Sequence, residues 1–89
     1  MPKISEFYGI RIVMNHWDWG RHNLPHIHAK YQEFEAVYSV PGGHLLTGRL
    51  PRRQKNMVEE WIEQHQEELM QNWQFAIVGK KLLEIEPLF

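Results

Sequence analysis

The chain has 89 residues, a mass of 10.8 kDa and a net charge of −1, a size that fits one domain over residues 1–89. It contains no cysteine, which excludes disulfides, thiolate catalysis and cysteine-ligated zinc. Its longest apolar runs are far shorter than the roughly 18–20 residues of a membrane span, and its N-terminus lacks the apolar core of a signal peptide, so we expect a cytoplasmic protein.

The first half of the chain is predicted to form a small antiparallel β-meander. Phe7–Met14 is rich in β-branched and aromatic residues, as strands are, and Asn15–Pro25 contains the glycine, proline and turn-forming residues of a loop. His26–Tyr31 alternates with the period of a strand that buries one face. Two further strands are expected at Phe34–Val40 and His44–Thr47.

The second half is predicted to contain one long amphipathic helix, from about Pro51 to Asn72, and a short final strand at Leu82–Ile85. Proline fits the first helical position, where its missing N–H removes no hydrogen bond. Apolar residues then recur at helical spacing and form one stripe, which comprises Met57, Val58, Trp61, Ile62, His65, Leu69 and Trp73. This stripe would pack the helix across the antiparallel sheet, which gives an α+β fold.

Five of the six histidines fall in the first half of the chain, and His26 and His28 form the best-defined pair. Both imidazoles leave the same face of the predicted strand, with Cβ atoms roughly 6–7 Å apart. Neutral imidazole is a ligand for zinc and other divalent transition metals. One hypothesis is therefore a metal-binding module whose ligands are His26 and His28, completed by His16, His22 or Glu35.

The same pair supports a second chemistry, which needs no cofactor. Histidine titrates near neutral pH, so one imidazole can act as a base and its neighbour as an acid. Lys30 lies on the same predicted strand face and would supply the positive charge that phosphodiester cleavage in RNA requires. His26, His28 and Lys30 are thus the candidate catalytic residues, and the alternative is that the two histidines are partly exposed strand residues with ordinary hydrogen bonds.

A basic segment, residues 49–55, holds Arg49, Arg52, Arg53 and Lys55 and no acid, whereas residues 56–89 carry seven glutamates and two lysines. The four cations surround the start of the predicted helix, where the helix dipole disfavours positive charge. A helix start combined with arginine side chains binds phosphate or carboxylate. The basic segment therefore predicts an anion site for RNA, a nucleotide or an acidic protein surface. The alternative is that these side chains pair with glutamates of the same chain.

Several motifs in order carry a resemblance that covers nearly the whole chain. They are Phe7-Tyr8-Gly9-Ile10, Pro25-His26-Ile27-His28-Ala29-Lys30-Tyr31, Leu50-Pro51-Arg52-Arg53 and the stretch from Trp61 to Trp73. Together they resemble a prokaryotic family, the domain of unknown function numbered 4160, whose signature is a P-H-F-H-A run. Ile27 stands here in place of the usual aromatic. The resemblance implies a small protein partner encoded by the neighbouring gene, in an arrangement similar to a toxin–antitoxin operon.

The residues and the resemblance leave three functions open. The first is one component of a toxin–antitoxin-type pair, which binds RNA or a protein through a surface made of the His26/His28 face and the basic segment, with or without ribonuclease activity. The second is the histidine-ligated metal-binding module. The third is a structural adaptor that forms a homo-oligomer, for example through an exposed sheet edge.

Overall fold

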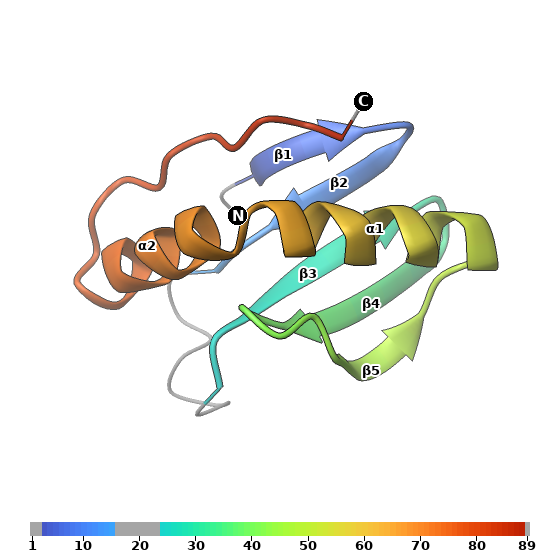
Figure 1. Ribbon diagram of the computed structural model, residues 1–89, viewed down its shortest axis with the longest axis horizontal. Coiled ribbons are helices and arrows are strands. Elements are labelled where there is room, and N and C mark those ends of the chain that lie inside the picture. The colour runs from blue at the N-terminus through green and yellow to red at the C-terminus, as the bar shows by residue number, and fades with distance from the viewer. Residues whose placement is uncertain (1–2, 16–23, 89) are drawn as a thin grey trace.

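In the computed structural model, two helices cover one face of a five-stranded antiparallel sheet, which confirms the α+β class (Figure 1). The structure describes residues 3–15 and 24–88. The strands lie in the sheet in chain order, as a meander of β1 (Lys3–Phe7), β2 (Ile10–Val13), β3 (His26–Tyr31), β4 (Phe34–Ser39) and β5 (Leu45–Arg49). The antiparallel meander is therefore confirmed, with one strand more than the sequence predicted.

The additional strand comes from a hairpin within the predicted first strand, so the single strand expected over Phe7–Met14 was wrong. Tyr8 and Gly9 both have positive φ, 50° and 79°, and Phe7 pairs with Ile10 across them. Two consecutive residues with positive φ form the tight turn that matches the twist of two antiparallel strands. The chain therefore reverses at Tyr8-Gly9, and β1 and β2 become neighbours in the sheet.

One face of the sheet forms the hydrophobic core together with the helices. Cross-strand partners such as Ile12 and Ala29, Ile27 and Tyr38, and Ala29 and Ala36 are fully buried. The helices meet them with a set of apolar side chains that includes Val58, Trp61, Ile62, Leu69 and Trp73. The stripe predicted from helical spacing thus faces the sheet, as its periodicity indicates.

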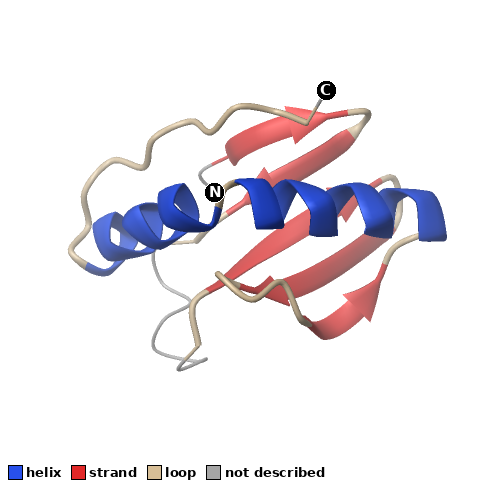
Figure 2. Ribbon diagram, viewed as in Figure 1, coloured by secondary structure: helices blue, strands red, loops and turns tan. Residues whose placement is uncertain are grey.

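The single long helix predicted over Pro51–Asn72 was wrong, because the chain forms two helices, α1 (Arg52–Gln64) and α2 (Gln66–Ile77) (Figure 2). The break lies at His65, whose φ of −126° and ψ of 31° are not helical. Its ring stays in place by packing 5.4 Å from the ring of Trp61 and by donating an Nδ1–H to the carboxylate of Glu68 at 2.6 Å. Neither helix has the length and apolar character needed to cross a membrane, and nor does any other helix within the described residues.

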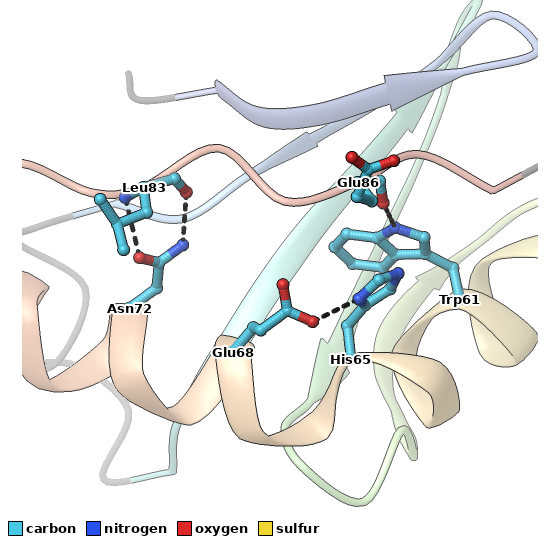
Figure 3. Close-up of polar contacts among 6 residues, drawn as sticks. All are labelled: Trp61, His65, Glu68, Asn72, Leu83 and Glu86. Carbon is cyan, nitrogen blue, oxygen red and sulfur yellow. Dashed lines mark hydrogen bonds and ion pairs between the residues drawn. The ribbon is translucent and has the colours of Figure 1, made fainter.

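The C-terminal segment is extended but is not a strand, so the prediction at Leu82–Ile85 was also wrong. Most of its polar contacts go to helix side chains (Figure 3). Asn72 accepts the Leu83 N–H at 2.9 Å and donates to the Leu83 carbonyl at 2.8 Å, and the Trp61 indole donates to the Glu86 carbonyl at 2.7 Å. One backbone bond, from the Ile85 N–H to the Ile4 carbonyl at 2.8 Å, ties the segment to β1. Leu82, Ile85 and Leu88 are buried at a spacing of three residues, so the segment lacks the period of two that a strand with one buried face has.

Tyr38 is fully buried under the helices, and its hydroxyl has no hydrogen-bond partner within the described residues. A buried polar group without a partner loses its hydration and gains nothing in return. We therefore expect Tyr38→Phe to raise the free energy of unfolding by about 1 kcal/mol, as measured by urea denaturation. A loss of stability would show that the hydroxyl has a partner when the protein is in solution.

The same substitution has an effect that depends on pH. Burial, together with the nearby Glu59 carboxylate, raises the pKa of Tyr38 from its ordinary value of 10 to about 12. Above pH 10 the unfolded chain releases this proton while the folded chain keeps it, so the free energy of unfolding falls as the pH rises toward 12. Tyr38→Phe removes this part of the alkaline loss, and its stability advantage should therefore be larger at about pH 11 than at about pH 8.

Candidate functional site

The face of the sheet turned away from the helices carries a row of charged residues, one from each strand. Glu6, Arg11, Lys30, Glu35 and Arg49 are successive cross-strand partners from β1 to β5, and we call them the charged row. Directly opposite residues in an antiparallel pair have Cβ atoms about 4.5–5.5 Å apart. The register therefore places three basic and two acidic side chains next to one another across the whole width of the sheet.

Arg11 and Lys30 are the only two directly opposed like charges in this row. Each lies beside a carboxylate on its other side, but both carboxylates have a nearer partner: Glu6 accepts from the Lys3 ammonium at 3.0 Å, and Glu35 accepts from His28. The Lys3 ammonium also lowers the pKa of Glu6, which keeps this carboxylate ionised. In the described part of the chain, no carboxylate lies within ion-pair distance of Arg11 or Lys30.

These two cations line a shallow pocket of about 300 Å³ together with Glu6, Gly9 and Gln32. The pocket lies where the Tyr8-Gly9 turn and the turn after Tyr31 come together at one end of the sheet. Its donors are a guanidinium, an ammonium and an amide, which are suited to the oxygen atoms of a phosphate or carboxylate. The pocket is therefore chemically suited to an anion.

His28 lies two residues from Lys30 on the same face of β3 and is held by a carboxylate. Its Nδ1–H donates to Glu35 Oε2 at 3.0 Å, and its side chain is 17% exposed. A carboxylate on Nδ1 fixes the orientation and the tautomer of the ring, as in enzymes that use histidine as a base. His28, Glu35 and Lys30 thus form a connected set on one face of the sheet, since Lys30 is the cross-strand partner of Glu35. The face is buried at His28, whose own cross-strand partners Val13 and Val37 are buried, and it is exposed at the charged row.

His26 occupies a different environment, although it projects near His28 as the alternation predicts. The two rings are 5.4 Å apart, but His26 is only 1% exposed. Its Nδ1–H donates to the Leu24 carbonyl at 2.9 Å, and its ring packs 5.3 Å from that of Trp73 in α2. His26 is therefore a packed residue that supports the start of β3, while His28 lies closer to the surface.

Two of the histidines proposed as metal ligands, His16 and His22, lie outside the described residues. Within residues 3–15 and 24–88, no group of three or more histidine, aspartate or glutamate side chains is arranged to hold a metal ion. His28 and Glu35 contribute one nitrogen and one carboxylate there, with His26 beside them.

The residues of the basic segment fall into three environments. Arg49 ends β5 in the charged row, with its guanidinium 5.2 Å from the centre of the Phe34 ring. Lys55 pairs with Glu59 at 3.0 Å, one turn along α1, as the intramolecular alternative anticipates. Arg52 and Arg53 are exposed in the first turn of α1, which has neither a side-chain cap nor an acidic residue. They lie in the helical layer, whereas His28 and Lys30 lie in the sheet.

Sequence reasoning missed Arg11, Glu6 and Gln32 as neighbours of Lys30. Arg11 is the exposed residue between two buried isoleucines, a signal that indicates a surface position on a strand. Its proximity to Lys30 depends on the pairing of β2 with β3, which are joined by a long connection. No local pattern in the sequence sets that pairing.

Comparison with protein-family models matches residues 9–74 to a family described as a domain of unknown function, DUF4160. The match runs from the turn before β2 into α2, so it includes Arg11, His28, Lys30, Glu35 and the basic segment. No curated protein and no solved structure matches the chain.

Proposed function

The chain belongs to the DUF4160 family, a domain of unknown function, and we propose that it binds RNA through the charged row on the open face of its sheet. The observation that carries this proposal is the direct opposition of Arg11 and Lys30 on adjacent strands. Like charges at this position destabilise a sheet. A phosphate bound between the two cations would attract both of them and would also relieve the repulsion between them. Both effects favour the anion-bound state.

The pocket beside these cations supports phosphate as the anion. Arg11 presents a planar set of N–H groups that matches two phosphate oxygens, and Lys30 adds a point charge from the next strand. Arg49 lies two strands further along the row, beyond the Glu35 carboxylate, so phosphates on either side of Glu35 would meet the cations of β2, β3 and β5. A net charge of −1 means that this local surface, rather than the whole molecule, would attract the nucleic acid.

The His28–Glu35 pair favours RNA over an acidic protein as the partner. A histidine oriented by a carboxylate can accept the proton of a ribose 2′-hydroxyl, a group that RNA has and proteins lack. We propose that, if the bound RNA is cleaved, His28 takes the 2′-hydroxyl proton as the 2′-oxygen attacks the phosphorus, and that the P–O5′ bond breaks while the 5′-oxygen takes a proton from water. Lys30 stabilises the phosphate charge, and His26 positions His28 from the core. Cleavage on this surface needs no cofactor.

The family resemblance supports a two-protein context for this activity, in the cytoplasm. We propose that a small protein encoded by the neighbouring gene binds the charged row and competes with RNA for it, as in a toxin–antitoxin-type pair. The charged row alternates in sign at both of its ends, which suits a protein surface with complementary charges. The neighbouring protein should therefore displace bound RNA rather than form a ternary complex.

The proposal is tested by titrating a fluorescently labelled single-stranded oligoribonucleotide with the protein at low salt and following anisotropy. We expect Arg11→Gln and Lys30→Gln each to weaken binding about five- to tenfold, because each removes one charged phosphate contact. Lys81→Gln, on the exposed C-terminal segment, is the matched control and should bind as the wild type does. Equal losses for all three variants, or none, would contradict the proposed surface.

Cleavage is measured on the same oligoribonucleotide by gel electrophoresis. If the RNA is cut, His28→Gln should abolish cleavage while binding changes less than twofold, since the phosphate contacts come from Arg11 and Lys30. Unchanged cleavage by His28→Gln would remove the catalytic role and leave RNA binding as the function.

A further inference from the structure

The two edges of the sheet differ in how they are covered. The C-terminal segment lies beside β1, where the Ile85 N–H donates to the Ile4 carbonyl (Figure 1). The other edge is β5, and all five of its residues are exposed. Within the described residues, no segment pairs with the outer side of β5. Residues 3–15 and 24–88 therefore cover one edge of the sheet and leave the other edge open.

The exposed edge has the composition of a strand that pairs. Leu45 and Leu46 are 45% and 41% exposed, and Leu45–Thr47 contains no proline or lysine, although a β-bulge makes Leu46 the extra residue of β5 opposite Val37 and Tyr38. Gly48, with a φ of 79°, ends the extended run. The part of the edge that can pair is therefore Leu45–Thr47.

Charge is distributed unequally along this edge. The C-terminal end of β5 leads into Arg49 and the exposed Arg52 and Arg53. At the N-terminal end, Glu59 and Glu63 line a pocket of about 450 Å³ with Gly43 and His44, because α1 runs back over the β4–β5 turn. Glu59 pairs with Lys55, so one end of the exposed edge is basic and the other carries the negative charge of Glu63.

We propose that β5 pairs with β5 of a second copy of this chain, antiparallel and about a two-fold axis through Leu46. Such a pair places Leu46 opposite Leu46 of the second copy, and Leu45 opposite Thr47 of the second copy. Beyond the paired residues, Arg49 of each chain lies toward the β4–β5 turn of the other. The basic end of each chain then meets the acidic pocket of the other, and two-fold symmetry makes this contact twice. The charges favour a second copy of this chain as the partner. When two β5 edges run antiparallel, the basic end of each lies beside the acidic end of the other.

The consequence is a continuous ten-stranded sheet whose open face carries two charged rows. This inference rests on β5 and the start of α1, and not on Arg11 or Lys30, so it stands or falls independently of RNA binding. If both hold, a dimer would present two RNA sites on one face and bind a long RNA more tightly than a short one.

The test is the solution mass of the full chain, measured by sedimentation over a range of concentrations. The expected mass is twice 10.8 kDa. Leu46→Lys should give a monomer, because the two-fold axis places the two ammonium groups opposite each other. Leu83→Lys, a substitution at a residue that is 53% exposed on the C-terminal segment, is the matched control and should stay dimeric. Far-UV circular dichroism confirms that both variants fold.

Charge reversal tests the orientation of the pair. Arg53→Glu should weaken the dimer about tenfold, and adding Glu63→Lys to the same chain should restore it, because both contacts are then reversed together. A wild-type mass of 10.8 kDa at every concentration would overturn the proposal. A dimer that survives Leu46→Lys would place the interface elsewhere and overturn it equally, and a failed rescue would overturn the antiparallel orientation.

Discussion

Replacing Trp61 by alanine is expected to lower the free energy of unfolding by about 3–5 kcal/mol, a large share of the roughly 5–10 kcal/mol available to a chain of this size. Trp61 is fully buried, and its ring lies 5.6 Å from Phe7 in β1 and 5.4 Å from His65 at the helix break. Its indole N–H also holds the C-terminal segment through the Glu86 carbonyl. One side chain thus joins the sheet, the helices and the C-terminal segment.

Urea denaturation followed by circular dichroism measures this loss. Trp61→Phe keeps most of the apolar contact but removes the donor to Glu86, so we expect a smaller loss of about 1–2 kcal/mol. Leu83→Ala, at an exposed position, should change stability by less than about 0.5 kcal/mol. A loss for Trp61→Ala as small as that of Leu83→Ala would show that Trp61 does not connect these layers.

Gly48→Ala is the second substitution with a large expected effect, at least about 2 kcal/mol of destabilisation. Gly48 has a φ of 79° in β5, and a Cβ built on it would overlap the carbonyl oxygen of Glu35 on β4. The alanine variant must therefore both adopt a strained backbone and push two strands apart. The displacement would also move Arg49, which follows Gly48 in the charged row.

Gly79→Ala is the matched control for Gly48→Ala. Gly79 has nearly the same φ, 76°, but nothing lies within 4 Å of the position its Cβ would take. It should therefore show only the conformational cost of a left-handed backbone, about 1 kcal/mol. Equal losses in urea denaturation for the two variants would show that contact with β4 does not restrict Gly48.

The elements that the sequence predicted correctly are those with a strong local pattern. The alternation at His26–Tyr31 predicts β3 with the bounds that the structure has, because Ile27 and Ala29 are fully buried and Tyr31, on the same face, is partly buried. The helical stripe predicts which residues of α1 and α2 face the sheet. The spacing of apolar residues indicates which side chains are buried. In β3 the buried side chains follow the repeat of a strand, and in α1 and α2 they follow the repeat of a helix.

The predictions failed where the pattern of buried side chains does not match the pattern of backbone hydrogen bonds. The C-terminal segment buries Leu82 and Ile85, which are three residues apart, and its backbone bonds mostly to Asn72 and Trp61 instead of a neighbouring strand. The helical stripe continues through His65 because the side chains on both sides of the break face the same sheet. A pattern of apolar residues cannot distinguish these cases from a strand or an unbroken helix.

The candidate site was predicted in part, for a related reason. His28 and Lys30 share a strand, so the sequence placed them on one face together. Glu35 joins them through the short β3–β4 hairpin. Arg11 joins them only through the pairing of β2 with β3, and the exposure of His28 as against the burial of His26 depends on α2. These contacts join distant parts of the chain, so the local spacing of residues does not predict them.

The most direct test of RNA binding by the charged row is the salt dependence of the affinity. The dissociation constant for a single-stranded oligoribonucleotide is measured at several salt concentrations, for the wild type and for the double variant Arg11→Gln/Lys30→Gln. Each phosphate contact contributes about 0.7 to the slope of log affinity against log salt, so the double variant should lose about 1.4 from that slope. A double variant with the wild-type slope and affinity would contradict RNA binding at this face.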